Sequence, residues 1–144
     1  MSDTPHRARR SGERMRRPVR CYLWAAPNSL AGLLLAVIAC SVGASVRRID
    51  GTLEVAGGRL MRWFARPQHL LPFCAITFGH VILGLDHALL ARVRAHEQVH
   101  VRQYERWGPL FIPLYLGSSL LEALRGRDPY RANHFERQAR SAEL

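Results

Sequence analysis

Two histidines and a glutamate stand close together in the second half of the chain, in the order His96-Glu97-Gln98-Val99-His100. In an α-helix, residues four apart lie on one face about one turn apart, so both imidazoles can bind one metal ion. Glu97 then projects beside the metal, where its carboxylate can reach a bound water without being a ligand. Zinc lowers the pKa of such a water to about 7, and Glu97 can accept its proton as a hydroxide attacks a carbonyl. The pattern predicts a zinc-dependent hydrolase with Glu97 as general base.

A catalytic zinc site of this kind needs a third protein ligand and keeps its fourth position for water. Glu136 is the predicted third ligand, because it stands at the start of a separate helix and an intervening helical hairpin can fold it back onto the metal. Asp128, His134 and Glu122 are the other candidates. The two motif histidines and Glu136 are therefore the predicted zinc ligands.

Other residues with reactive or polar side chains are weaker candidates for a role in the predicted catalytic site. Tyr104 follows His100 by one turn and could stabilise an oxyanion, but an aromatic residue at this position is more often part of the core. His80 is interpreted as a structural histidine on a strand. The histidines without partner spacing, which are expected to be structural or exposed, are His87, His69 and His6.

The motif lies in a segment with clear helix boundaries. Helix formers run from Leu85 to Trp107, with Asp86 as a candidate N-cap and Gly108-Pro109 as a stop. A last helix is expected to open at Asn133. Strands are expected over 52–55, 59–64 and 75–83, which alternate or are rich in β-branched and aromatic residues, and they predict a small antiparallel sheet.

An apolar stretch near the N-terminus has the length of a membrane anchor. No charged residue occurs from Cys21 to Val46, and about 18 or more apolar residues suffice to cross a bilayer core. Residues 21–46 are therefore predicted to form a hydrophobic helix that crosses the membrane once. Two alternatives are a lipoprotein signal cleaved before Cys40 and a helix packed into the domain itself.

The distribution of charge predicts the topology. The chain has 21 basic residues, all arginine, against 11 acidic residues, a formal net charge of +10. Seven arginines precede residue 21, which predicts a disordered tail over 1–20 and, by the positive-inside rule, a cytoplasmic N-terminus. Residues 47–144 are then expected to form one domain outside, with 109–124 too short to cross again. No aromatic or Gly-rich motif of the kind that recognises nucleic acid accompanies the arginines, so nucleic acid is not an expected partner.

Three segments carry a family resemblance: Thr77 to Gly84, His96 to Pro109 and Tyr130 to Arg137. They resemble a group of small bacterial proteins with zincin-like features, over approximately residues 22–140. The resemblance implies a gluzincin-type metallopeptidase and names no substrate. In that group an Asn-Pro-Phe-Glu element supplies a glutamate ligand, which falls on Glu136 here, with His134 in place of the usual proline.

Together these expectations describe an α+β, zincin-like domain with a small antiparallel sheet, the motif helix and an N-terminal hydrophobic helix. The expected activity is that of a membrane-associated zinc metallopeptidase, with a peptide or protein as substrate. Two alternatives are a membrane-associated zinc protein without catalysis, and a basic adaptor for membrane surfaces or nucleic acid in which the motif is accidental.

Overall fold

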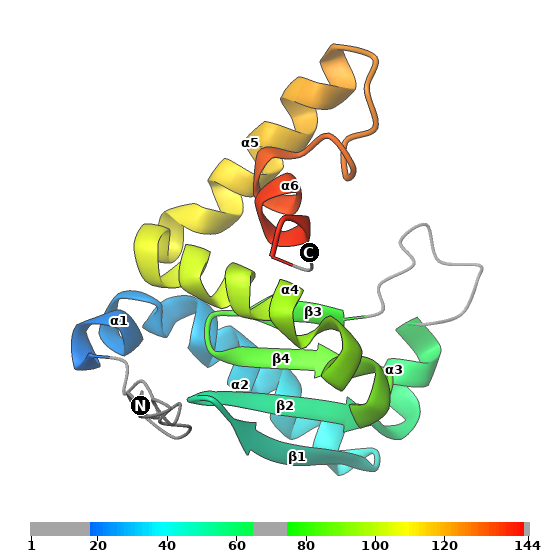
Figure 1. Cartoon of the computed structure of the whole chain (residues 1–144). Helices are drawn as coiled ribbons and strands as arrows, with labels where there is room; N and C mark the ends of the chain where they lie inside the picture. Colours follow the sequence, from blue (N-terminus) through cyan, green and yellow to red (C-terminus); the bar gives the residue numbers. More distant parts are fainter. Residues whose placement is uncertain (1–17, 65–74, 143–144) are drawn as a thin grey trace, which may run out of the picture.

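Residues 18–64 and 75–142 are described by the computed structural model, and they confirm the expected α+β class (Figure 1). Most of the predicted tail over 1–20 lies outside these residues, as do His6 and His69. In chain order the elements are α1 (Val19–Trp24), α2 (Ala26–Ser41), β1 (Ala44–Ile49), β2 (Thr52–Gly57), α3 (Gly58–Phe64), β3 (Ala75–Phe78), β4 (Val81–Gly84), α4 (His87–Trp107), the 3-10 turn η1 (Gly108–Leu110), α5 (Phe111–Leu124) and α6 (His134–Arg140).

The described residues contain four strands, which form one mixed sheet in the order β1-β2-β4-β3. The outer pairs are antiparallel, with Val46 of β1 opposite Val55 of β2 and Thr77 of β3 opposite Ile82 of β4. The central strands β2 and β4 are parallel, with Val55 opposite Leu83. The expectation of a wholly antiparallel sheet is therefore wrong. The reason is that α3 and β3 separate the central strands and return the chain to the end where β2 begins.

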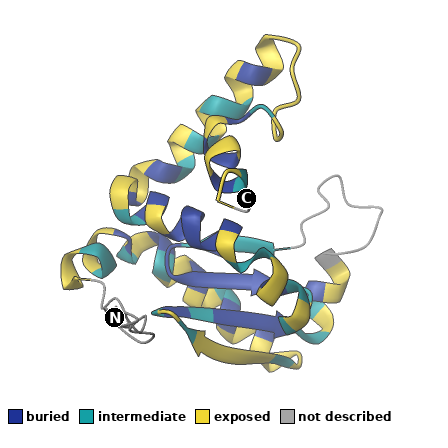
Figure 2. Cartoon of the chain, viewed as in Figure 1, coloured by how far each residue is buried: buried dark blue, intermediate teal, exposed yellow. Residues whose placement is uncertain are grey.

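α2 covers one face of the sheet and α4 covers the other (Figure 1). Successive side chains of β4 point to opposite faces, as a strand requires. Val81 and Leu83 belong to the core cluster that includes α2, whereas Ile82 belongs to the cluster that includes α4. Figure 2 shows the result, since β2 and β4 are mostly buried and β1 is mostly exposed.

The expectation of a strand over residues 59–64 is wrong, because this segment belongs to α3. Gly57 and Gly58 both have positive φ, at 81° and 78°, and turn the chain out of β2. Leu60 and Met61 are consecutive, yet both pack into the core cluster beneath α2. Neighbouring residues of a strand point to opposite faces, so a helical turn is what lets this pair share one core.

Residues 75–83, expected as one strand, form two strands joined by a tight turn at Gly79 and His80. Gly79 has a φ of 59°, and a Cβ at this position would collide with the hydroxyl of Ser29 on α2. His80 thus lies in a turn rather than on a strand. Its backbone N–H donates to Ser29 Oγ at 3.1 Å, and its Nε2 lies 3.0 Å from Glu105 Oε1. These contacts fasten the turn to both α2 and α4.

α2 is the hydrophobic helix that the sequence predicts, but it ends at Ser41, and β1 already begins at Ala44. Its buried alanines, Ala36 and Ala39, share a core with the sheet, which is the arrangement of the packed-helix alternative. Within the described ranges, no helix combines the length and the apolar character that crossing a membrane requires. A crossing by residues 21–46 stays a prediction.

α4 begins and ends where its sequence signals place it. The Asp86 carboxylate caps the helix by accepting a hydrogen bond from the backbone N–H of Leu89 at 2.7 Å, and Gly108 ends it with a φ of 54°. Arg94 of this helix donates two hydrogen bonds, of 2.7 and 3.1 Å, to the buried carboxylate of Glu54 on β2. This bidentate pair joins the motif helix to the sheet.

Gly32 of α2 lies where the helix packs tightly against the sheet. A Cβ there would lie 2.8 Å from Val81 Cβ and 2.9 Å from the Phe78 carbonyl oxygen. We expect Gly32→Ala to lower the free energy of unfolding by about 1–3 kcal/mol through overpacking. Gly117→Ala is the matched control, because a Cβ there meets nothing within 4 Å, and it should raise stability by up to about 1 kcal/mol. Urea unfolding compares the two, and equal stabilities would contradict the tight packing of α2.

Candidate metal centre

α4 and α6 bring the predicted ligands together. His96 and His100 lie one turn apart on α4, and Glu136 lies in the first turn of α6. The Nε2 atoms of the two histidines are 3.1 Å apart, and Glu136 oxygens lie 3.2 Å from His96 Nε2 and 3.4 Å from His100 Nε2. Within the described residues, these three side chains form the group of His, Cys, Asp and Glu whose ligand atoms are close enough to hold one metal ion.

The spacing of these atoms fits a tetrahedral zinc site. Bonds from zinc to nitrogen or oxygen are about 2.0–2.1 Å long, so the edges of a tetrahedron of such ligands measure about 3.3 Å. The 3.1 Å between the two Nε2 atoms lies close to that value, and each imidazole has its own Glu136 oxygen nearby, Oε2 at 3.2 Å from His96 and Oε1 at 3.4 Å from His100. Two imidazoles and one carboxylate also leave the fourth position for water or substrate, as a catalytic zinc site requires.

The hydrogen bonds around His100 prepare it as a ligand. The Phe135 carbonyl can only accept, so the amide nitrogen of Gln103 faces it at 3.2 Å and the amide oxygen faces His100 Nδ1 at 2.8 Å. His100 therefore carries a proton on Nδ1, and its Nε2 faces the other ligands. Among the described residues, none donates a hydrogen bond to the buried Oε2 of Glu136. Lone pairs that converge in a buried site repel unless a proton or a metal ion lies between them.

The surroundings keep Glu136 ionised, which a zinc ligand must be. Burial acts to raise the pKa of this carboxyl, but contacts with the His100 and His96 imidazoles and a hydrogen bond from Tyr115 hold it well below its ordinary value. The Tyr115 hydroxyl donates to Glu136 Oε1 at 2.8 Å. Burial and this hydrogen bond raise the pKa of Tyr115, so the phenol stays protonated as the donor.

Asn133 places Glu136, because it fixes the start of α6. Its side-chain oxygen caps the helix by accepting from the backbone N–H of Phe135 at 2.8 Å. Its side-chain nitrogen donates to the Tyr115 carbonyl at 3.0 Å and to Ser119 Oγ at 2.7 Å, both on α5. Asn133 is wholly buried, so these bonds replace water that its amide would otherwise contact. One side chain thus joins α5 to the helix that carries the carboxylate.

Glu97 is oriented by the sheet rather than by its own helix. It is buried, and Thr77 of β3 donates a hydrogen bond to its Oε2 at 2.6 Å. Glu97 and the three ligand candidates line a cavity of about 420 Å³, whose walls come from β3, α4, α5 and the segment that leads to α6. The apolar part of the wall includes Phe111, Ile112, Tyr115 and Leu116.

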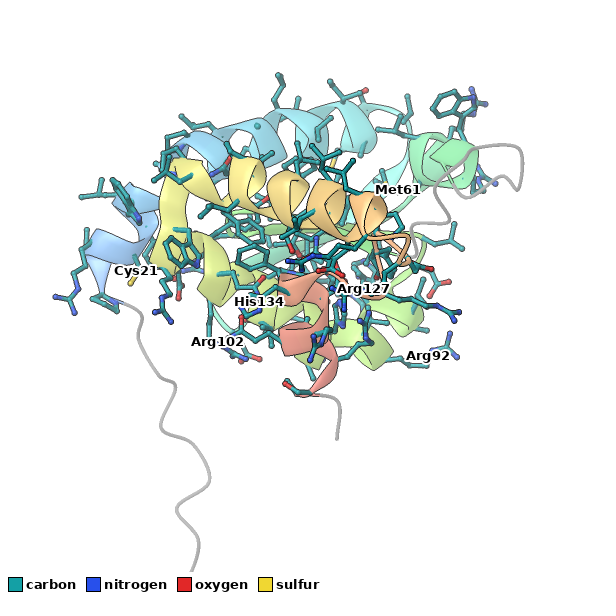
Figure 3. The ribbon with its side chains drawn as sticks, turned by 90° about the horizontal axis from the view of Figure 1, so that it is seen from above. Cys21, Met61, Arg92, Arg102, Arg127 and His134 are labelled. Atoms are coloured by element: carbon teal, nitrogen blue, oxygen red, sulfur yellow. The ribbon has the colours of Figure 1, made fainter. Side chains whose placement is uncertain are left out.

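The alternative third ligands lie away from this cluster. His134, labelled in Figure 3, and Asp128 are both exposed. Glu122 is buried, but its carboxylate is paired with Arg125 at 3.1 Å and with Arg127 at 2.6 Å. The structure therefore brings the two motif histidines together with Glu136 and with none of the competing candidates.

Tyr104 is a core residue, as the sequence analysis favours. It is 3% exposed, and its ring packs edge-on against Phe111 with centroids 4.4 Å apart. The sequence assigns no role to three supporting residues, namely Thr77, Gln103 and Tyr115. A local signal exists for Gln103, because it follows His100 by three residues and lies on the same helix face. Thr77 and Tyr115 reach the site through tertiary contacts, which no spacing in the sequence reveals.

No family model, curated protein or solved structure matches this chain. The resemblance to zincin-like bacterial proteins therefore stays a prediction that rests on the three motif segments. Because no similar fold suggests a function, a function can be argued only from the geometry of the candidate metal centre.

The purified protein is expected to hold close to one zinc ion per chain, because three ligand atoms converge on one point. His100→Ala removes one of these ligands and should lower the zinc content to a small fraction of the wild-type value after dialysis. His134→Ala is the matched control, since this histidine is exposed and is not one of the three clustered side chains. Elemental analysis measures all three proteins, and an unchanged zinc content in His100→Ala would contradict the site.

Gln103→Leu is expected to weaken zinc binding by about 10- to 100-fold, because it removes the acceptor that holds His100 Nδ1. Gln138→Ala is the control, since it removes a second contact of the Gln103 amide, at 2.8 Å, but leaves the bond to His100 in place. Competition with a fluorescent zinc chelator gives both affinities. Equal affinities in the two variants would show that the Gln103–His100 bond does not support the metal.

Proposed function

We propose that this chain is a zinc-dependent hydrolase that cleaves amide bonds of a peptide or protein substrate. The observation that carries the proposal is the convergence of His96, His100 and Glu136 at 3.1–3.4 Å, with Glu97 on the same cavity. This set supplies three ligands of the types that zinc hydrolases use and one carboxylate that is not a ligand.

Zinc, when bound at this site, supplies an acidic water and a centre that polarises a carbonyl. Glu97 has the role of the general base that accepts the proton of the attacking water and passes it to the leaving amine. Thr77 holds the Glu97 carboxylate by donating to Oε2, so the base keeps one orientation. Gln103 and Tyr115 do the same for His100 and Glu136.

β3 supports the choice of an extended peptide as substrate. Among the described strands, β3 is at the end of the sheet, with β4 on one side and no strand on the other. Its residues 75–78 line the same cavity as Glu97. An extended peptide can add to such an edge through main-chain hydrogen bonds, with a side chain in the neighbouring pocket. The aromatic and aliphatic wall formed by α5 favours an apolar side chain there.

Glu97→Gln is expected to keep one zinc per chain and to lower hydrolysis by about 100- to 10,000-fold, because an amide cannot accept the proton. Mass spectrometry of a proteome-derived peptide library, incubated with zinc-loaded protein, measures the cleavage. Zinc analysis of the same samples shows that the loss is not a loss of metal.

Two outcomes would contradict the proposal. Full cleavage by the Glu97→Gln variant would remove Glu97 from the role of base. A wild-type protein that holds zinc and cleaves no peptide in the library would support the alternative of a non-catalytic zinc protein.

A further inference from the structure

Large apolar side chains point outward from two long helices. On α2, Leu30, Leu34 and Val37 are 65%, 63% and 68% exposed, and they follow one another at helical spacing. On α5, the corresponding stripe is Leu116, Leu120 and Leu124, which are 60%, 61% and 77% exposed. These six residues are called the apolar face. Single exposed leucines are ordinary, but two such stripes on one small chain mark an interaction surface.

The two helices that carry the stripes start near each other. Figures 1 and 3 show that α2 and α5 start near a common end and diverge from it, and Figure 3 shows α6 on the opposite side of α5 from α2. At that common end, Asn28 of α2 donates to the carbonyl of Gly108 in η1 at 2.9 Å. The inner faces of both helices are covered, α2 by the sheet and α5 by α4 and α6. The outward stripes have no covering element among the described residues.

The charges around the apolar face have one sign. No acidic residue occurs between Glu13 and Asp50, a range that includes all of α1, α2 and β1. On α5, the acidic residue is Glu122, whose charge is already paired with two arginines. Exposed arginines flank α2 in the chain, Arg20 in α1 and both Arg59 and Arg62 in α3.

We propose that the apolar face, with its arginines, docks this protein onto the surface of an anionic lipid bilayer. Outward apolar stripes can enter the boundary between headgroups and acyl chains, while the arginines contact the phosphates. Trp24, at the end of α1, is 50% exposed and suits the headgroup level. A second copy of the chain would bring like charges together, since the net charge is +10. An anionic lipid surface is thus the partner whose charge fits.

This docking is independent of the zinc proposal and requires no helix to cross the bilayer. The residues tested are Leu34 on α2 and Leu120 on α5, whereas the metal ligands lie on α4 and α6, and Leu116, which also lines the cavity, is left unchanged. Loss of either function therefore leaves the other measurable.

The test is flotation of the purified full chain with vesicles of phosphatidylglycerol and phosphatidylcholine, compared with vesicles of phosphatidylcholine alone. We expect partitioning at least about tenfold stronger on the anionic vesicles, and weaker at high salt. The double variant Leu34→Glu with Leu120→Glu should lower partitioning by at least about tenfold, because it places charge on both stripes. The same variant should keep its zinc.

The matched control is Ala91→Glu with Ala142→Glu, which adds the same charge at two exposed positions outside the apolar face. It should bind anionic vesicles within about threefold of the wild type, with the small difference due to net charge. Three results would overturn the proposal: no vesicle binding by the wild type, equal losses in the two double variants, or a stable dimer in solution that the Leu34→Glu, Leu120→Glu variant dissociates.

Discussion

The burial of one carboxylate between two imidazoles is the constraint on which the second half of this molecule depends. An ionised carboxylate away from water costs several kcal/mol unless it is paired and hydrogen-bonded. α6 can therefore pack against α4 because the Glu136 carboxylate contacts both His96 and His100. Asn133, Tyr115 and Gln103 complete the hydrogen bonds of this junction. Packing and site chemistry thus depend on the same few atoms.

The sheet and α2 supply rigidity rather than ligands. The sheet holds α4 through the buried Glu54–Arg94 pair and orients Glu97 through Thr77. α2 supports the opposite face of the sheet, and the Gly79–His80 turn joins it to both helices. The proposed base and the candidate ligands are therefore held in place by different elements. Glu97 is oriented by β3, the edge strand to which we propose that the substrate binds.

Features governed by neighbouring residues could be predicted from the sequence, and features governed by distant contacts could not. Asp86 and Gly108 mark the ends of α4 through their own side chain and backbone, so both ends are predicted correctly. Glu136 is found because an acidic residue at a helix start is a recognisable ligand candidate. The parallel pairing of β2 with β4 and the helical state of residues 59–64 depend on which core the chain meets, and both are missed. Thr77 and Tyr115 are missed as well, because they contact Glu97 and Glu136 across long distances in the sequence.

The brevity of α6 has a consequence for how the protein would respond to a metal ion at this site. A helix of seven residues is not stable by itself, so α6 owes its structure to its contacts with α4 and α5. An ion held by Glu136 and the two histidines would join this end of the chain to the rest and add its binding free energy to that of folding. Without the ion, the C-terminal end of the chain would be held less firmly. Proteases would then cleave the metal-free protein sooner than the metal-bound protein, because they cleave loosened chain ends first. The same ligands that serve chemistry would thereby act as quality control, marking the metal-free protein for removal.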